Sequence, residues 1–554
     1  MKPLTCVLLM AIFCWLGSSL YANNLSITGL SVSQNSSTGG TVTFTITWNN
    51  CWNLSTGTAP NNWDAAWVFV KFRSCAASPA VPFTQGTLGT YSQHVIPSTL
   101  QAMTSLPQSS YYTAGGSTVI TSGSLDDPNG IMLSPTTAGT QTSVTGSVTL
   151  YVTNLPANTI AITADVIGIE MVYVPQGPFN LGDGSTNGSY YHFCTSASSS
   201  SPALIGANYE TAAQTFYYMS NGTSTPASYA ASVPAAFPKG YYAFYCMKYE
   251  ITEDLYSSFL NTIGSSGAQN RWLGNSGTNR NQVSQTNSST FATARPYRAQ
   301  NFMSFADWEA VLDWACLRPM SELEFEKACR GGSSTTANGA MNNEFPWQST
   351  SITTPTTTGP SFSGAETGTE TIVGGNNCNA NLNWNFSNGD GGQGPVRAGI
   401  FATSSTGQQT AGSTYYGIME MGGNVREYVI ELSSNVAADT FTRNVGNGIL
   451  ISTPGTPLAG TVIGDEFVST WPSPTTATPA ATGFSSVIGQ RGGDFYSGPN
   501  EGSYANLSIN SYYDPIQTSS RYMCYYNTNY NNSCIYQTYT GVGRYNGTGG
   551  RGVR

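Results

Sequence analysis

Charge is scarce in this sequence. Charged residues make up 9% of its 554 positions, against about 25% in ordinary soluble domains. The chain has no clusters of basic residues, so nucleic-acid binding is not expected. Aromatic residues account for 12% of the chain, which is untypical of disorder. We therefore expect folded domains with a neutral surface rich in hydroxyl and amide groups, typical of extracellular proteins that contact their own copies, a matrix or glycans.

Histidine and closely spaced cysteines are also rare. His94 and His192 are the only histidines, so no site can hold three histidine ligands, and neither lies in a recognisable catalytic triad motif. No two cysteines are separated by two residues, which excludes a thioredoxin-like site and a zinc ribbon. An exported protein favours disulfides, and Cys51 with Cys75 is one candidate pair beside the predicted strand near Trp67.

No apolar run is long enough for a membrane-spanning helix, but the N-terminus has the pattern of a secretory signal. Lys2 precedes an apolar run at positions 4–16, and a small residue, Ala22, ends the segment. This pattern predicts a signal peptide over 1–22 and a mature chain that begins near Asn23. A retained N-terminal anchor is the alternative. We expect the mature protein to be secreted or displayed at the cell surface, without a transmembrane segment.

Two structural units are expected after the signal. Residues 23–167 contain short alternating runs at 41–48 and 147–152 and a denser apolar run at 68–72. Such runs are typical of antiparallel strands, and several of them predict an immunoglobulin-like β-sandwich. The second unit, 168–554, combines strands, helices and long neutral loops. The fold class of the whole chain is therefore α+β.

Three helices in the second unit have clear start signals. Thr252 precedes a helix over 253–260, while Ser304 with Asp307 and Ser321 with Glu324 form predicted capping boxes. Long loops rich in Thr, Ser, Pro and Gly follow at 348–375 and 451–483. Loops of this length on a compact fold usually bind ligands or form assembly contacts.

A series of ordered motifs runs through the second unit. They are MVYVPQGPF at 171–179, YEIT at 249–252, RPMSELEFE with ACRGG at 318–332, YGIMEMGGNVREY at 416–428, RGGDF at 491–495 and GRGVR at 550–554. In this order they resemble the formylglycine-generating enzyme, or sulfatase-modifying factor, family. The resemblance implies a compact, loop-rich α+β fold related to C-type lectins.

The resemblance also identifies the positions where the chemistry of the family takes place. Its oxidases bind copper through two cysteines, which lie five and ten residues before a third, structural cysteine. Here the structural cysteine is similar to Cys524, so the two catalytic positions are Ser519 and Asp514. Neither residue has the soft sulfur that holds Cu(I). We expect no copper and no formylglycine-generating activity. The iron-dependent branch of the family needs three histidines and is excluded as well.

Two structural features of the family are retained. The resemblance implies a disulfide between Cys329 and Cys524. It also implies two calcium ions, held by carboxylate, amide and carbonyl oxygens as expected for a hard cation. The first site corresponds to Asn381, Leu382, Asp390 and Gly392. The second site corresponds to Glu420, Gly423, Val425 and Glu427. The alternative is that these residues form turns and ordinary acid pairs.

Three functional hypotheses remain open from the sequence. The first is a non-catalytic structural or adhesion protein that assembles into a filament or layer. The second is a glycan-binding module, suggested by the lectin-like fold and by tyrosines between Tyr512 and Tyr530. The third is an enzyme with altered chemistry that uses Asp514, Glu427 or Arg491. Sequons such as the one at Asn53 permit glycosylation without establishing it.

Overall fold

A computed structural model of the chain describes most of the predicted second unit and nearly all of the first. The described residues are 21–22, 25–55, 59–106, 117–184, 192–219, 226–228, 233–274, 277–332, 340, 342–353, 359–374, 378–382, 384–432, 441–450, 468, 470–471, 488–497, 516–520, 522–523 and 544–554. They mix helices with many strands, which confirms the α+β class.

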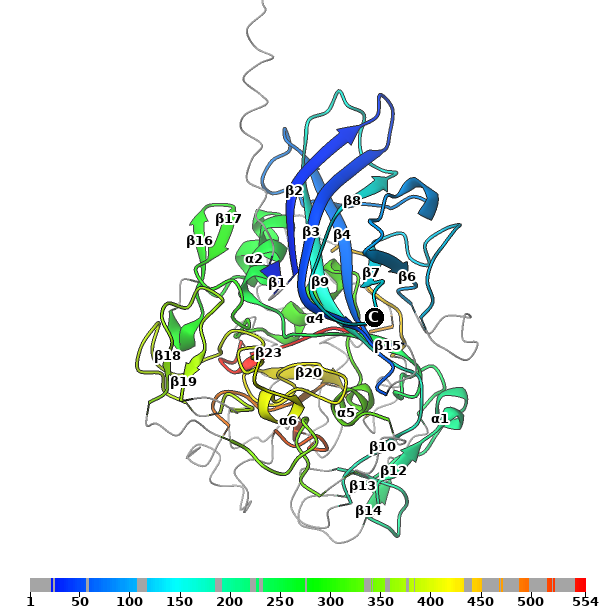
Figure 1. Ribbon diagram of the computed structural model, residues 1–554, viewed down its shortest axis with the longest axis vertical. Helices are drawn as coiled ribbons and strands as arrows, with labels where there is room; N and C mark the ends of the chain where they lie inside the picture. The colour runs from blue at the N-terminus through cyan, green and yellow to red at the C-terminus, as the bar shows by residue number, and fades with distance from the viewer. Residues whose placement is uncertain are drawn as a thin grey trace, which may run out of the picture.

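Two antiparallel sheets form the N-terminal part (Figure 1). The outer sheet has the order β1 (Tyr21–Ala22), β2 (Leu25–Gln34), β3 (Gly40–Asn53) and β8 (Gly139–Val152). The central sheet has the order β15 (Phe244–Met247), β9 (Ile162–Val174), β4 (Asp64–Ser74), β7 (Ile131–Pro135) and β6 (Leu100–Met103), with β5 (Thr84–Gln85) beside β4.

The central sheet is buried on both faces. Along β4, Ala66, Val68 and Val70 belong to a core shared with the outer sheet, whereas the alternate residues Trp67 and Phe69 belong to a second core on the opposite face. This alternation is the period of a β-strand. It also explains the dense apolar run at 68–72, because strands buried on both faces read as continuous hydrophobic stretches.

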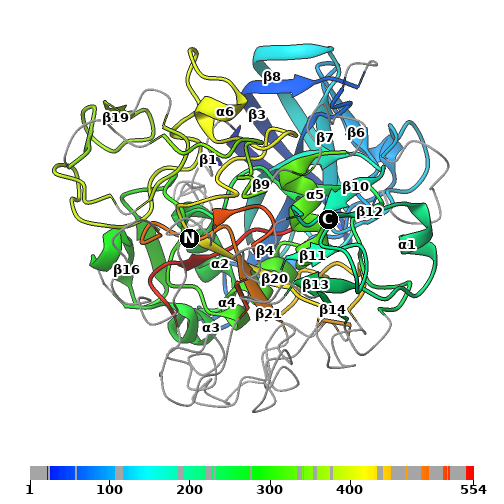
Figure 2. The ribbon, with the colours of Figure 1, turned by 90° about the horizontal axis from the view of Figure 1, so that it is seen from below.

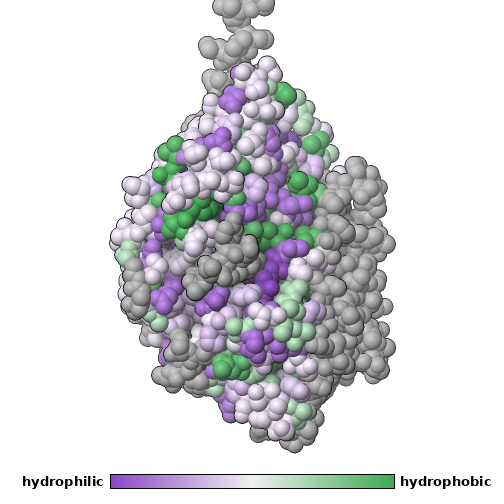
Figure 3. Space-filling view, turned by 90° about the vertical axis from the view of Figure 1, so that its right-hand side faces the viewer, coloured by the Kyte–Doolittle hydropathy of each residue, from purple (hydrophilic) through white to green (hydrophobic). Residues whose placement is uncertain are grey.

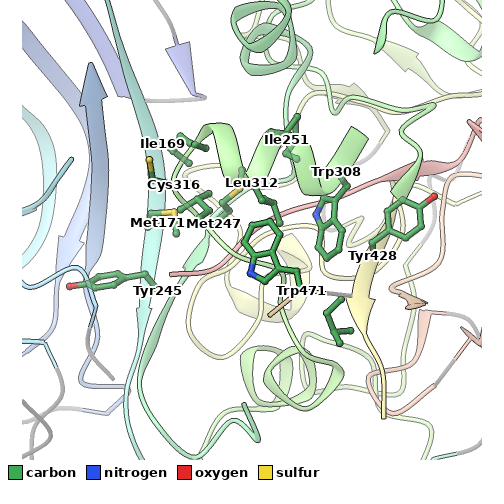
Figure 4. Close-up of a cluster of buried hydrophobic side chains, with 14 of the residues drawn as sticks. Ile169, Met171, Tyr245, Met247, Ile251, Trp308, Leu312, Cys316, Tyr428 and Trp471 are labelled. Atoms are coloured by element: carbon green, nitrogen blue, oxygen red, sulfur yellow. The ribbon is translucent and has the colours of Figure 1, made fainter. Parts of the chain in front are cut away.

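Helices cover the second face of the central sheet. They are α2 (Glu253–Thr262), α3 (Ser265–Arg271) and α4 (Phe305–Trp314). Helix α5 (Glu322–Arg330) packs mainly in a separate cluster with Val172 and Val174 of β9. Shorter helices are α1 (Ala207–Thr211) and α6 (Gln408–Ala411), and 3-10 turns lie at Tyr91–Gln93 and Thr278–Arg280. Figure 4 shows side chains from β9, β15, α4 and β20 converging in this second core. Both predicted capping boxes are confirmed, since Ser304 with Asp307 and Ser321 with Glu324 exchange cap hydrogen bonds.

Small sheets and irregular segments complete the second unit (Figure 2). The largest has the order β22 (Tyr522–Met523), β21 (Ile488–Arg491), β20 (Arg426–Ile430) and β23 (Thr548–Gly549). The others are β10 (Phe179–Leu181) with β12 (Ala203–Ile205), β11 (Phe193–Cys194) with β13 (Tyr217–Met219) and β14 (Pro226–Ser228), β16 (Val283–Asn287) with β17 (Thr290–Thr293), and β18 (Ser361–Phe362) with β19 (Ile372–Val373).

Residues 550–554 are threaded through the centre of the molecule. The Arg554 and Tyr245 backbones exchange two hydrogen bonds of 2.8 Å, and the Val553 and Arg318 backbones exchange two more. The Arg554 guanidinium lies 3.6 Å from the centre of the Trp67 ring and pairs with Asp127. The last of the six motifs therefore joins β15 and the central sheet.

The two predicted units share one strand. The expected boundary between 167 and 168 falls inside β9, which pairs with β4 along 162–172 and with β15 along 171–174. At Gly168 a side chain would come within 2.8 Å of Ile27, so glycine permits the close approach of β2. The N-terminal strands and the second unit are thus continuous through the central sheet.

The candidate pair Cys51–Cys75 is wrong. Cys51 is buried near Asp64, at the start of β4, whereas Cys75 is exposed just beyond the other end of that strand. An eleven-residue strand separates them, a span of roughly 35 Å, far beyond disulfide reach. None of the seven cysteines in the described part of the chain is bonded to another of them.

Candidate functional site

The position expected for a catalytic cysteine lies in a sealed, polar part of the interior. Ser519 is fully buried, and its hydroxyl has no hydrogen-bond partner. Arg491 of β21 donates to the flanking Thr518 and Ser520 carbonyls, at 3.2 and 2.9 Å. The same guanidinium binds Glu322 of α5 at 2.8 Å. The other expected position, Asp514, lies outside the described residues.

The motif residues around this position form buried ion pairs. Arg318 binds both oxygens of Glu324, at 2.8 and 2.7 Å. Arg330 binds Glu326 and Glu344 at 3.0 and 2.8 Å. Bidentate, desolvated pairs of this kind fix side-chain orientation. These motifs therefore hold α5 against the rest of the second unit.

The residues of the second predicted calcium site come together at the start of β20. Glu420 has a left-handed backbone, with φ of 52°, and its Oε1 accepts from the Gly399 N–H at 2.7 Å. Glu427 Oε1 accepts from Arg551 Nε at 2.7 Å. The second oxygen of each carboxylate, Glu420 Oε2 and Glu427 Oε2, is buried without a hydrogen-bond partner. Gly423, between them, has φ of 84°.

Burial dominates the electrostatics of this pair. Glu420 has a pKa of about 7, because burial and the Glu427 carboxylate raise it more than the Gly399 N–H and Arg551 lower it. Burial also raises the pKa of Glu427, against the lowering effect of Arg551. A divalent cation would remove this cost by neutralising both carboxylates. The residues present thus fit a calcium ion.

A third acid, Glu250, was missed by sequence reasoning. It is buried, its oxygens accept from Val425 N–H at 3.0 Å and from Asn424 Nδ2 at 2.5 Å, and burial together with Glu420 raises its pKa well above the usual range. Its place in the YEIT motif was the available signal. Asn424 also accepts from Asn381 Nδ2 at 3.1 Å, so the two predicted calcium regions are hydrogen-bonded to each other.

The first predicted site is arranged differently. Asn381 Oδ1 is buried without a partner, as a ligand oxygen would be. Asp390, however, is engaged by Arg295 at 2.7 and 2.9 Å and by Arg298 at 2.8 Å. These partners lower the pKa of Asp390 despite its partial burial. The carbonyl of Gly392 accepts from the Phe386 N–H, and Leu382 is buried in a small apolar cluster. Asp390 therefore fits a cation poorly.

A protein-family model matches the part of the chain that contains most of these motifs. The sequence model of the Sulfatase-modifying factor enzyme 1-like domain matches residues 167–449, more than half of the chain. The chain belongs to the formylglycine-generating enzyme family. The motifs at 491–495 and 550–554 lie beyond the match, yet β21 and β23 pair with β20 inside it.

Other comparisons add little to this family assignment. No curated protein matches the chain. The crystal structure of the group B streptococcus pilus 2b backbone protein aligns with 40% of this chain and 83% of that chain, at 16% identity and a TM-score of 0.12. A TM-score this low does not support a common fold.

The predicted disulfide can be followed at only one of its two cysteines. Cys329 is buried, and burial raises the pKa of its thiol. Its expected partner, Cys524, lies outside the described residues, so the Cys329–Cys524 disulfide stays a prediction. Within the described ranges no three His, Cys, Asp or Glu side chains converge on a metal position. The second predicted calcium site would not be of that type, because two of its four expected ligands are backbone carbonyls.

Some residues of the enzyme and glycan-binding hypotheses also lie within the described part of the chain. Arg491 and Glu427 are both held in buried ion pairs. Most of the tyrosines between 512 and 530 lie outside the described ranges. Asn53 of the Asn53-Leu54-Ser55 sequon is buried, and its amide donates to the Pro135 carbonyl at 2.8 Å. Across the described residues, no helix combines the length and apolar character needed to cross a membrane.

Proposed function

We propose that this family member is a non-catalytic extracellular structural or adhesion protein that assembles with its own copies or a matrix. The observation that carries the proposal is Ser519, a buried hydroxyl where the family oxidases have a copper-binding cysteine. A hydroxyl is a poor ligand for Cu(I) and a weak nucleophile without an adjacent base. The retained parts of the family pattern support the fold rather than the oxidation.

The distribution of charge supports an assembly role. Every lysine and arginine among the described residues is buried or half-buried, and their partners are mostly buried acids. Figure 3 accordingly shows a face dominated by pale, intermediate hydropathy with scattered hydrophilic and hydrophobic residues. A surface with so little charge repels its own copies only weakly.

The outer sheet offers a specific route to assembly. Beyond Ser26, β2 pairs only with β3 among the described strands, and its sequence LSITGLSVSQ contains no charge or proline. Natural sheets usually protect such an edge with lysine or proline. Signal cleavage after Ala22 would also remove β1 and free the rest of the edge. We infer that the N-terminal sheets act as a sandwich that accepts a strand from another copy.

Calcium supports the family domain in this proposal. Glu420, Glu427 and the carbonyls of Gly423 and Val425 would hold the ion at the start of β20, where two buried carboxylate oxygens have no other partner. The ion would supply charge neutralisation and order to the loop. For the first site the support is limited to Asn381, because Asp390 is occupied by arginines.

Electron microscopy and sedimentation of the purified chain, with calcium and with chelator, test the assembly. We expect filaments, layers or oligomers in calcium. Lysine substitutions at the exposed edge residues Thr28 and Ser33 should reduce assembly, whereas lysine at exposed Ser198, away from this edge, should not. A chain that stays monomeric at high concentration in calcium contradicts the proposal. Turnover of a cysteine-containing sulfatase peptide with copper and oxygen would contradict its non-catalytic part.

A further inference from the structure

A buried lysine and two buried carboxyls meet on one face of the central sheet. Lys248 Nζ lies 3.0 Å from Asp64 Oδ2 and 3.3 Å from Glu170 Oε2. The exposed fraction of the lysine side chain is 6%, and both acids are at 0%. Burying three charged groups costs desolvation free energy, which their pairing offsets. The cation here is a primary amine, whereas the cation beside Glu326 and Glu344 is an arginine.

Three adjacent strands fix this arrangement. Asp64 begins β4 and pairs with Val172, two residues along β9 from Glu170, so both acids point to the same face. Lys248 follows β15, and its backbone N–H donates to the Glu170 carbonyl at 2.9 Å. Strand β9 lies between β15 and β4. Glu170 on β9 is therefore placed between Lys248, which follows β15, and Asp64 on β4.

The two carboxyls differ in their surroundings. Glu170 is anchored, because Oε1 accepts from the Leu25 N–H at 3.0 Å and Oε2 from Trp48 Nε1 at 3.2 Å. Asp64 uses one oxygen for Lys248, and its Oδ1 is buried without a hydrogen-bond partner. Asp64 is thus the carboxyl free to react, and Glu170 is the one held in place.

The surroundings exclude bulk water and bring reacting groups into contact. The Trp52 ring lies 4.5 Å from Lys248 Nζ and covers it. Reacting groups held at about 3–3.5 Å in a fixed orientation gain a large rate advantage over free molecules.

From this geometry we propose that Lys248 and Asp64 form an intramolecular isopeptide bond, with Glu170 carrying the proton between them. The neutral Nζ attacks the Asp64 carboxyl carbon, and a C–N bond forms. The carboxyl hydroxyl leaves with one proton from Nζ, passed by Glu170, as a water molecule. The products are one amide and one water, Glu170 is regenerated, and no oxidant or cofactor is consumed.

The step needs the acid form of Asp64 and the neutral form of Lys248, so the amine must first pass a proton to the carboxylate. Burial raises the pKa of Asp64 well above its usual range, which favours the acid form whose hydroxyl can leave. For Lys248, burial lowers the pKa while Asp64 and other neighbours raise it, and the net direction is upward. The proton that must move from the amine to the acid lies in the 3.0 Å hydrogen bond between them.

Mass spectrometry of the full chain tests the bond. The protein is reduced, denatured and weighed, and its N-terminus is read by peptide mapping. We expect a mass lower than that of the sequence by one water, no tryptic cleavage after Lys248, and a branched peptide that joins Lys248 to Asp64. Asp64→Asn should lose ammonia instead of water, and Lys248→Arg should lose neither.

The control is another buried lysine. Lys327 Nζ donates to the backbone carbonyls of Tyr241 and Tyr242 rather than to a pair of carboxylates, so Lys327→Arg should retain the water loss. Glu170→Gln should leave a measurable fraction of unlinked chain. A wild-type chain with the full sequence mass and normal cleavage after Lys248 overturns the proposal and identifies a simple ion pair. A water loss mapped to any other position overturns it as well.

Discussion

Replacing Trp67 by phenylalanine tests whether the central sheet makes the molecule one cooperative unit. Trp67 is fully buried, and its Nε1 donates to the Ala315 carbonyl at 2.8 Å, at the end of α4. The Arg554 guanidinium lies over the face of the Trp67 ring, 3.6 Å from the ring centre. One side chain of an N-terminal strand thus contacts two distant parts of the family domain.

The expected cost follows from these contacts. Phenylalanine has no N–H, so the buried Ala315 carbonyl loses its partner, at a cost of about 1–3 kcal/mol. The smaller ring leaves a gap and weakens the interaction with Arg554 by about 1 kcal/mol more. A total of roughly 2–4 kcal/mol corresponds, for a chain of this length, to a fall in melting temperature of roughly 2–3 °C.

Calorimetry together with near-ultraviolet circular dichroism measures the effect. We expect a single transition in the wild type that shifts as a whole in Trp67→Phe. Trp272→Phe is the matched control, because Trp272 is only half-buried and donates to the Val283 carbonyl at a longer 3.2 Å, so a loss of at most about 1 kcal/mol is expected. Two separate transitions, one of them unmoved by Trp67→Phe, would refute the reasoning.

Three further outcomes are expected. Chelation of calcium should lower the melting temperature. The expected loss of stability is about 2.7 kcal/mol when the ion is present at a hundred times its dissociation constant, and Glu427→Gln should abolish that response. An unchanged melting curve with no metal by elemental analysis contradicts the site. Burial lowers the pKa of Lys327 to about 7, so the folded chain loses a proton that the unfolded chain keeps. The free energy of unfolding should therefore rise between about pH 7 and pH 10, and denaturant titrations of Lys327→Met should show a smaller rise. Arg318→Leu, which leaves Glu324 buried and unpaired, should cost about 3–5 kcal/mol, against less than about 1 kcal/mol for Arg295→Leu at a partly exposed pair; equal losses in denaturant unfolding would contradict this difference.

The local features of the fold could be predicted because their causes are local. The caps at Ser304 and Ser321 depend on residues three positions away, so the pattern alone identifies them. The alternation at 41–48 lies within β3, and the dense run at 68–72 lies within β4. The ordered motifs identified the family because each one has a structural task in the second unit.

The features that were missed depend on contacts between distant segments. Nothing near Asp390 in the sequence shows that Arg295 and Arg298 take its carboxylate. The sequence also did not predict that both units share strand β9. The change in composition at 168 resembles a domain boundary, whether or not a strand continues through it. Lys248 likewise gives no signal by itself, since Asp64 lies far away in the sequence.

The position of residues 550–554 has a consequence for the order of folding. Their backbone partners lie on β15 and at Arg318, and the Arg554 side chain lies on Trp67, so these contacts join segments separated by hundreds of residues. Proteins dominated by such long-range contacts fold slowly, because loop closure precedes the stabilising contacts. The contacts of Trp67 with Arg554 and of Trp308 with the Arg551 carbonyl cannot form until residues 550–554 are available. During synthesis these contacts can therefore form only after the strands and helices that precede residues 550–554 have been made.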